Sequence, residues 1–192
     1  MTSPKTKQAP ARQRLLDAAA RLFYADGMTA TGIDAITTEA GVARKSLYNN
    51  FSSKQDLMLA YIEARHEEWL KLYRARLERA GSPTERVLAV FDAYLDHARA
   101  AYQNGFRGCG LLNAAAELPV DAPGRAAVRQ HKEEVERILT EHLREAGVTY
   151  SAAMAEHLAF LLEGAVSRAG LEGGPERLTH ARRIAARLLE AR

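Results

Sequence analysis

The sequence is poor in the residues that build covalent and metal-bound scaffolds. Its 192 residues include a single cysteine, Cys109, which excludes an intrachain disulfide and any metal site made of several cysteines. No apolar run approaches the roughly 18 residues of a membrane-spanning helix, and the opening Met-Thr-Ser-Pro-Lys has no hydrophobic signal core. We therefore expect a cytoplasmic protein without a membrane partner.

Catalytic signatures are missing as well. The six histidines are scattered without a His-Glu-X-X-His pair, and there is no glycine-rich phosphate loop. No nucleophilic serine or cysteine has a base close to it in the sequence, although triads also assemble from distant residues. We predict no enzyme activity, no metal site and no cofactor; a helical ligand-processing enzyme stays as an alternative.

The charge is unevenly distributed, although the formal total is only +3. Residues 1–54 contain eight lysines and arginines against four acids, whereas the rest of the chain has 19 cations and 20 anions. A basic N-terminal segment on a nearly neutral body suggests that the smaller part binds a polyanion. The length allows this division into a small module and a larger one.

Helical periodicity runs through almost the whole chain, and no segment has the alternation of a strand. Thr31, Ser53, Ser82 and Ser151 are predicted N-caps, because their side chains can accept from free helical N–H groups. The pattern predicts an all-α fold of about nine helices. They cover approximately residues 15–23, 31–40, 42–50, 53–80, 82–104, 107–118, 126–146, 151–169 and 178–188.

Residues 33–48 have the spacing of a helix-turn-helix. Ile33 and Ile36 are apolar positions of the first helix, Gly41 suits the sharp turn, and Leu47 would hold the second helix against the first. A second helix with a cationic outer face fits the major groove of DNA, where arginine or lysine donates to guanine O6 and N7. The residues on that face are Ala43, Arg44, Lys45, Tyr48 and Asn49.

The residues around this motif resemble the N-terminal signature of the TetR family of bacterial transcriptional regulators. The resemblance is carried by Thr29-Ala30-Thr31-Gly32-Ile33, Ala40-Gly41-Val42, Ser46-Leu47-Tyr48-Asn49-Asn50-Phe51-Ser52-Ser53-Lys54 and Leu57. It implies a flexible basic arm at 1–10, a three-helix DNA-binding domain at 11–58, and a helical effector-binding and dimerisation domain at 59–192. The expected partners are a double-stranded DNA operator, a small-molecule effector and a second copy of the chain.

By this resemblance, Arg44 and Lys45 occupy base-reading positions, and their charge suggests a site that contains guanine. The turn that starts at Thr31 would offer backbone N–H groups to a phosphate. Asn50 stands where histidine is common in the family, and Thr37 where a small apolar residue is common. The side chains expected to touch the DNA backbone are Ser46, Tyr48, Asn49, Asn50 and Lys54.

A structural interpretation exists for each of these residues. Tyr48 and Phe51 could be plain core aromatics, and Arg44 and Lys45 could form a solvated face, as charge runs usually do. Glycine, apolar spacing and a basic arm in register favour DNA binding, because a motif in its expected context is more specific than any single match.

Two helices of the C-terminal body suggest a dimer. Residues 151–169 combine small residues with leucines and phenylalanine, which lets helices approach closely, and the last helix would complete one half of a four-helix interface. A two-fold dimer demands a palindromic operator. The alternative is that these helices cap a monomeric core.

Aromatic residues predict where a ligand could bind. Candidates for lining a cavity between helices are Trp69, Tyr94, Tyr102, Phe106 and Phe160. Cys109, Asn113 and Glu117 recur every four residues, and such a polar stripe should need partners inside the fold. It is either a ligand-contacting or thiol-sensing stripe, or a hydrogen-bonded core feature with an inert cysteine.

Together these features predict a homodimeric repressor that a small molecule releases from its operator. The ligand would favour a conformer in which the long helix from Ser53 has swung, and so change the separation of the two recognition helices. A DNA-binding dimer without an effector is the alternative, and a solid core without a cavity would favour it.

Overall fold

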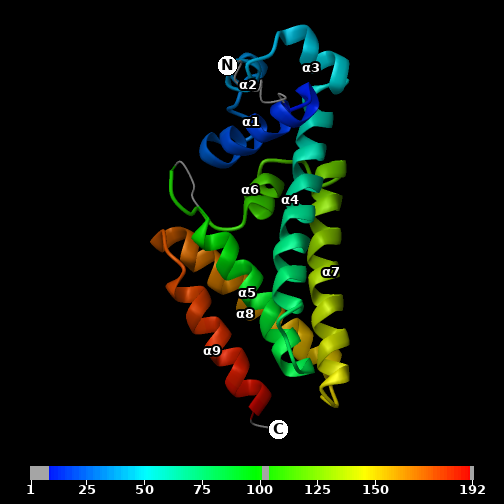
Figure 1. Ribbon diagram of the computed structural model, residues 1–192, viewed down its shortest axis with the longest axis vertical. Coiled ribbons are helices and arrows are strands. Elements are labelled where there is room, and N and C mark those ends of the chain that lie inside the picture. The colour runs from blue at the N-terminus through cyan, green and yellow to red at the C-terminus, as the bar shows by residue number, and fades with distance from the viewer. Residues whose placement is uncertain (1–8, 101–103, 191–192) are drawn as a thin grey trace, which may run out of the picture. The chain divides into compact units, whose positions relative to one another are not determined.

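The computed structural model describes residues 9–100 and 104–190, and within these ranges every regular element is an α-helix (Figure 1). The all-α fold class is thus confirmed. None of the described helices combines the length and apolar character that crossing a membrane requires. The helices are α1 (Ala11–Asp26), α2 (Ile33–Ala40), α3 (Arg44–Asn50), α4 (Lys54–Leu77), α5 (Pro83–Arg99), α6 (Gly110–Ala116), α7 (Pro123–Glu145), α8 (Ser151–Glu172) and α9 (Glu176–Glu190).

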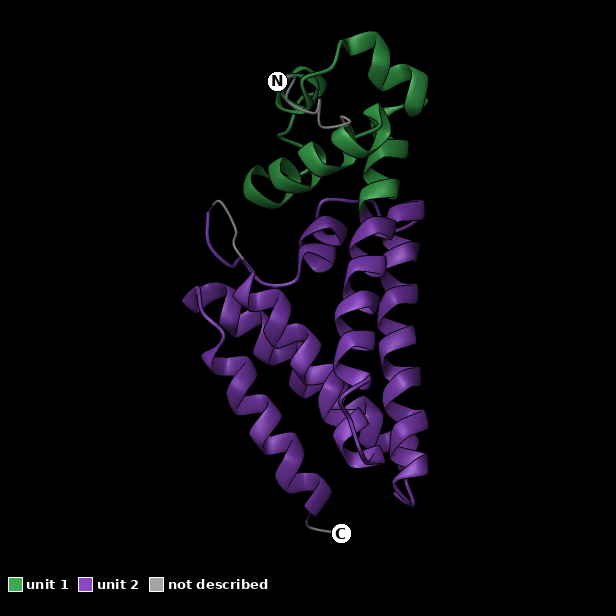
Figure 2. Cartoon of the chain, viewed as in Figure 1, with its two compact units in different colours: residues 1–61 green, residues 62–192 purple. Residues whose placement is uncertain are grey.

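The chain divides into two compact units, residues 1–61 and 62–192 (Figure 2). The division falls inside α4, so this helix is shared between them. In the first unit α1 packs against α2 and α3. Leu15, Ile36 and Leu47, one from each of these helices, are fully buried and form a common core. Burying such side chains contributes about 1.5–3 kcal/mol each.

The turn between α2 and α3 is fixed by a glycine and an arginine. Gly41 has a φ of +62°, a left-handed conformation that glycine adopts without a steric penalty. Arg14 of α1 donates from Nε to the Ala40 carbonyl at 2.9 Å and from Nη2 to the Gly41 carbonyl. Thr37 is buried beneath the turn, and its hydroxyl donates to the Asp34 carbonyl at 3.1 Å. Threonine therefore fits where the family often has a small apolar residue.

Thr31 does not begin the second helix, and this N-cap prediction is wrong. Gly32 takes the N-cap position, and α2 begins at Ile33. The Thr31 hydroxyl donates back to the Gly27 carbonyl at 2.6 Å, and its N–H donates to the same carbonyl at 3.3 Å. The side chain closes the turn after α1 because a carbonyl at the end of that helix lies within its reach.

The prediction for Ser151 is wrong too, because Tyr150 takes the N-cap position and Ser151 is the first residue of α8, whereas the predicted caps at Ser53 and Ser82 are present. At the start of α4 the Asp56 N–H donates to Ser53 Oγ at 3.1 Å, and at the start of α5 the Glu85 N–H donates to Ser82 Oγ at 3.2 Å. The Glu85 carboxylate accepts in return from the Gly81 N–H at 2.6 Å, which completes a box-like cap. The α5 helix that this cap begins is buried along most of its length and packs against α7 and α9.

The start of α6 and the end of α8 are two of the helix ends that differ from the prediction. The α6 helix begins at Gly110 rather than at 107, because Gly108 has a φ of +83°, outside the helical region. The α8 helix continues past 169, and its Gly170 lies directly against Gly108. A Cβ at Gly170 would come within 2.5 Å of the Gly108 backbone nitrogen. The two glycines therefore allow a close contact of backbones.

Replacing Gly170 by alanine is expected to lower the free energy of unfolding by about 1–3 kcal/mol, because the new methyl group meets backbone atoms that cannot rotate away. Urea denaturation of the purified protein measures this change. Ser167→Ala, at an exposed position of the same helix, is the control and should cause no loss. Equal stability of Gly170→Ala and the parent protein would show that the contact between the backbones is not required.

Candidate DNA-binding surface and ligand site

The second helix of the motif presents a cationic surface. Leu47 is fully buried, which fixes one side of α3 against the core and turns the other side outward. Arg44, Lys45 and Asn49 are exposed on α3, and the aromatic Tyr48 is 46% exposed. Tyr48 is thus not a core residue. Four of the residues predicted to touch DNA are exposed on this helix.

Arg44 is already paired on this surface. Its Nη1 donates to both carboxylate oxygens of Asp34, at 3.0 and 3.2 Å, and Asp34 lies in the first turn of α2. The Tyr48 hydroxyl and then the Asp34 carboxylate raise the pKa of Arg44 above its ordinary value, so the guanidinium stays charged. This pair was not predicted from the sequence, where its one signal is an acid within a basic motif.

The side chains expected to touch the DNA backbone are partly engaged. Asn50 Nδ2 donates to the Ser46 carbonyl of the same helix at 2.8 Å. Lys54 Nζ donates to the Thr29 carbonyl at 3.2 Å. Thr31 directs both its hydroxyl and its N–H to an internal carbonyl, so a phosphate at the start of α2 would have to be bound by other groups of that turn.

Several cationic side chains of the N-terminal unit make contacts within that unit. Residues 1–8 of the predicted basic arm lie outside the described residues. Arg12 lies over the Phe51 ring, 5.1 Å from its centre, and Arg21 pairs with a carboxylate of α2 at 2.9 Å. Arg14 holds the turn described above. The described arginines of α1 therefore have partners within the unit, and α3 offers the clearest surface for a polyanion.

In the second unit, two of the predicted pocket residues meet around a histidine. The rings of Trp69 (α4) and Tyr94 (α5) lie 5.6 Å apart, and Trp69 meets His131 of α7 edge-on at 5.3 Å. The Tyr94 hydroxyl is 3.4 Å from His131 Nε2, and His131 Nδ1 is 2.9 Å from His66 Nδ1. The buried indole N–H of Trp69 has no acceptor among the described residues. A buried N–H donor without an acceptor costs about 1–3 kcal/mol, and an acceptor atom of a ligand would remove this cost.

A partly buried ion pair, with side chains 21% and 33% exposed, lies beside these aromatic rings. Lys132 Nζ of α7 is 2.6 Å from Glu163 Oε1 of α8, 3.7 Å from Cys109 Sγ and 5.6 Å from the centre of the Tyr94 ring. Burial alone would lower the pKa of Lys132, but Tyr94, Cys109 and Glu163 together raise it above its ordinary value. Because the pair depends on the packing of α7 against α8, it could not be predicted from the sequence.

The predicted polar stripe does not share one environment. Cys109 is buried at the N-cap of α6, whereas Asn113 and Glu117 are exposed. Asn113 Nδ2 donates to the Arg107 carbonyl at 3.0 Å, at the surface. The expectation that the whole stripe needs partners inside the fold is wrong, because the short α6 turns Leu111 and its neighbours toward the core instead.

The Cys109 thiol is expected to be slow to react, because it is only 8% exposed. Its reaction with a disulfide reagent such as dithionitrobenzoate should be at least about tenfold slower in the folded protein than in urea, as is usual for buried structural cysteines. Absorbance of the released thiolate measures both rates. Comparable rates in the two conditions would favour the thiol-sensing interpretation.

The other residues predicted to line a pocket lie in different environments. Phe106 is buried with its ring centre 6.2 Å from that of His97, in the same unit as the aromatic group. Phe160 is 67% exposed on α8 and lies over a shallow depression between α8 and α9, so it lines no interior cavity. Tyr102 lies outside the described residues.

The buried histidines predict a pH-dependent stability. Burial, with help from Lys132, lowers the pKa of His131 to about 3, and burial with Arg65 lowers that of His97 to about 4. An unfolded histidine titrates near about 6.5, so below that pH only the unfolded chain gains these protons and stability falls.

Each buried histidine should contribute a slope of about 1.4 kcal/mol per pH unit below about pH 6.5. His131→Gln removes one such group, so its stability should fall less steeply from about pH 6 to about pH 5 than that of the parent protein. Urea denaturation at several pH values measures the two slopes. Equal slopes would mean that His131 takes up its proton in the folded state.

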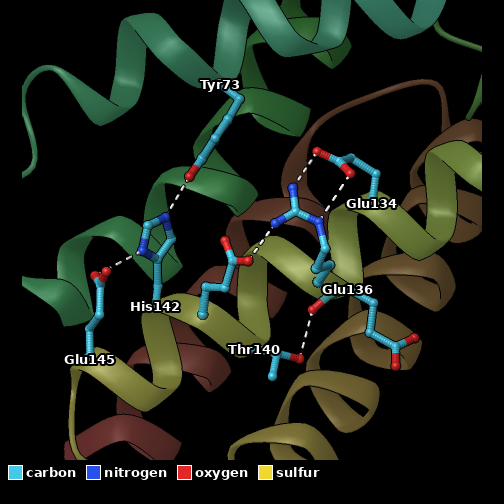
Figure 3. A network of polar contacts seen from close by, with 8 residues as sticks. Tyr73, Glu134, Glu136, Thr140, His142 and Glu145 are labelled. Carbon is cyan, nitrogen blue, oxygen red and sulfur yellow. Dashed lines mark hydrogen bonds and ion pairs between the residues drawn. The ribbon is translucent and has the colours of Figure 1, made fainter.

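A polar network at another part of this unit joins a tyrosine, a histidine and a glutamate (Figure 3). The Tyr73 hydroxyl is 2.6 Å from His142 Nε2, and His142 Nδ1 is 3.2 Å from Glu145 Oε2. Burial raises the pKa of Tyr73 to about 12, so the phenol stays neutral. The network ties α4 to α7. No group of three metal-ligating side chains was found among the described residues.

A three-helix unit whose third helix has a cationic outer face, joined to a helical body, defines a helix-turn-helix protein of the DNA-binding class. Residues 15–61 match the family model of bacterial regulatory proteins, tetR family, and residues 83–185 match the tetracyclin repressor-like C-terminal domain. The chain belongs to the tetR family of bacterial regulatory proteins. The resemblance inferred from the motif is thus confirmed.

Relatives of known structure share the fold over nearly their whole length. SCO4454, a TetR-family transcriptional regulator from Streptomyces coelicolor, is 37% identical, with a TM-score of 0.83 over 93% of this chain and 95% of that one. The transcriptional activator FasR of Mycolicibacterium smegmatis is 34% identical over 44% of this chain and 39% of its own length. The repressor KstR2 of the same organism is 35% identical over 47% of this chain and 45% of its own length. The chain spans less than half the length of these two curated relatives.

Proposed function

We propose that this protein is a sequence-specific transcriptional repressor that binds a palindromic double-stranded DNA operator as a homodimer and leaves it when a small molecule binds. The observation that carries the proposal is the α3 surface, where Arg44 and Lys45 face outward while Leu47 anchors the opposite side. Membership of the tetR family supports it. A bacterial regulator of this kind works in the cytoplasm.

On DNA, Arg44 and Lys45 would donate to guanine O6 and N7 in the major groove. Tyr48 and Asn49, which are exposed beside them, would hold phosphates. Asn50 and Lys54 now donate to backbone carbonyls, and a phosphate oxygen would replace these neutral acceptors with a stronger, charged one. Ser46 would add a hydroxyl at the same edge.

The dimer would form through α8 and α9. These helices pack together, and an apolar depression of about 420 Å³ runs along their outer surface. The residues that line it include Phe160, Leu161, Gly164, Ala181 and Ile184. An exposed phenylalanine beside small residues favours a self-complementary contact, in which each Phe160 enters the depression of the other copy.

The effector would bind near the aromatic group of the second unit. Trp69 and Tyr94 supply flat apolar walls, the unpaired indole N–H supplies a donor, and the pair of Lys132 with Glu163 supplies both charges. Phe106 and Cys109 lie in the same unit and are buried as well. This combination suits a planar ligand with a hydrogen-bond acceptor on its edge.

The coupling between ligand and DNA would run through α4. This helix belongs to both units, so a ligand that favours one position of α4 changes how the two recognition helices of a dimer are separated. The corresponding division is a DNA-binding domain at 11–58 after a basic arm at 1–10, and an effector and dimerisation domain at 59–192.

Selection of genomic fragments bound by the full-length protein tests the proposal. Enrichment of a palindrome, repression of a reporter that carries it, and release by a metabolite in a gel-shift screen would support all parts. Enrichment without release by any metabolite would favour the DNA-binding dimer without an effector. A protein that enriches no sequence would contradict the proposed function and revive the helical enzyme.

A further inference from the structure

The acidic residue of the DNA-binding surface is Asp34, and its position relative to Arg44 is specific. Asp34 lies in the first turn of α2 and Arg44 is the first residue of α3, so the ion pair spans the turn at Gly41, which joins the two helices labelled in Figure 1. Both carboxylate oxygens accept from the same nitrogen, Nη1 of Arg44, at 3.0 and 3.2 Å. The Asp34 side chain is 77% exposed and the Arg44 side chain is 59% exposed, so the pair is at the surface that DNA would cover.

The way in which Asp34 holds Arg44 determines what the guanidinium can still do. Since Asp34 uses only Nη1, the edge formed by Nε and Nη2 is not used by the carboxylate. That edge carries the parallel donors that match guanine O6 and N7. An exposed ion pair of this kind contributes about 0–1 kcal/mol, so it favours the Arg44 rotamers that reach Asp34 without fixing a single one before DNA binds.

The carboxylate also affects which DNA groups Arg44 can approach. A phosphate that pairs with Arg44 must come close to the negative charge of Asp34, whereas the guanine edge is uncharged. Like charges at such a distance repel each other, most strongly once DNA has displaced the water between them. Asp34 therefore penalises the contact that carries no sequence information.

We propose that Asp34 is a positioning residue for DNA recognition, which aligns Arg44 with a guanine in each half-site and keeps it from pairing with phosphates. This inference rests on the proposed function and deepens it, because it names a specificity-determining residue that does not read a base itself. The expected partner is a half-site with guanine at the position that Arg44 reaches.

The chain offers a matched control on the same helix. Glu39 of α2 pairs with Arg21 of α1 at 2.9 Å, and neither residue belongs to α3. Asp34→Asn and Glu39→Gln each remove one carboxylate from α2 and change the net charge equally. Any general electrostatic effect on DNA affinity should appear in both variants, whereas the alignment of Arg44 should change only in Asp34→Asn.

The experiment compares full-length variants on two probes by fluorescence anisotropy: a duplex selected with the parent protein and a random-sequence duplex of equal length. Asp34→Asn should bind random DNA about three- to fivefold more tightly, with a salt dependence steeper by about one unit per protomer, because Arg44 now pairs with phosphate. Its ratio of selected to random affinity should fall at least about tenfold, with relaxed preference at one guanine per half-site. Glu39→Gln should keep the ratio and the base preference of the parent.

A double-mutant cycle identifies the partner. In an Arg44→Ala background, Asp34→Asn should leave the ratio unchanged, because the residue that it positions is gone. The inference is overturned if Asp34→Asn and Glu39→Gln behave alike, or if Asp34→Asn lowers the ratio equally with and without Arg44. Failure of the proposed function is a different result: the parent protein itself would then show no preference for any selected duplex.

Discussion

Replacing Arg44 and Lys45 together by alanine is expected to lower the affinity for a selected operator by at least about 1,000-fold. Each base contact of this kind contributes about 1–3 kcal/mol, and a dimer loses the pair in both half-sites. Affinity for random DNA should fall much less, since phosphate contacts of other side chains persist. Fluorescence anisotropy on the two kinds of duplex measures both effects.

The control for this variant is Arg129→Ala combined with Arg144→Ala, which removes the same charge from exposed positions of α7. It should bind the operator nearly as the parent does, because α7 lies outside the helix-turn-helix. Folding of both variants is checked by their helical circular dichroism. An Arg44→Ala and Lys45→Ala variant that loses affinity for operator and random DNA by the same factor would show that these residues bind phosphates rather than bases.

The helix-turn-helix could be predicted because its determinants are local. Gly41 at the turn and Leu47 one helical turn into the second helix define the motif by spacing alone, and the structure has both in the expected roles. The pairing of Arg44 with Asp34 could not be predicted. It exists only because the closed turn brings the first turns of α2 and α3 together, and spacing along the chain does not specify side-chain direction.

The polar groups beside the candidate ligand site could not be predicted for a related reason. Trp69 and Tyr94 were identified as large aromatic residues, but Lys132 and Glu163 look like ordinary surface charges in helices that are polar on one side. Their burial results from the packing of α7 against α8. The prediction for Asn113 was wrong in the opposite sense. Its spacing placed it in a polar stripe with partners inside the fold, whereas the short α6 leaves it at the surface.

The uneven charge of the sequence also has a different meaning in the structure. It suggested that the whole basic N-terminal segment serves a polyanion, yet Arg14 and Arg21 stabilise the arrangement of α1 and α2. The cations that remain on the surface of α3 are few, and one of them is held by a carboxylate. The surface of α3 therefore carries a few donors, one of them held by a carboxylate, rather than a broad positive patch.

Replacing Phe160 by arginine is expected to dissociate the dimer. The side chain is 67% exposed in one copy, so the protomer should stay folded. In the proposed interface each copy would lose a buried aromatic side chain worth about 1.5–3 kcal/mol, and the symmetry doubles the effect to about 3–6 kcal/mol. The dimer dissociation constant should rise by about two to four orders of magnitude, which sedimentation velocity over a range of concentrations measures.

The same variant connects assembly with DNA binding. A monomer places one recognition helix on DNA and loses the second half-site, so the affinity for a palindrome should fall at least about 100-fold at concentrations where the variant is monomeric. Val120→Arg is the control, because Val120 is 84% exposed but lies between α6 and α7, outside the proposed interface. A Phe160→Arg protein that still sediments as a dimer would place the interface elsewhere. A monomeric one that binds the palindrome as the parent does would separate dimerisation from recognition.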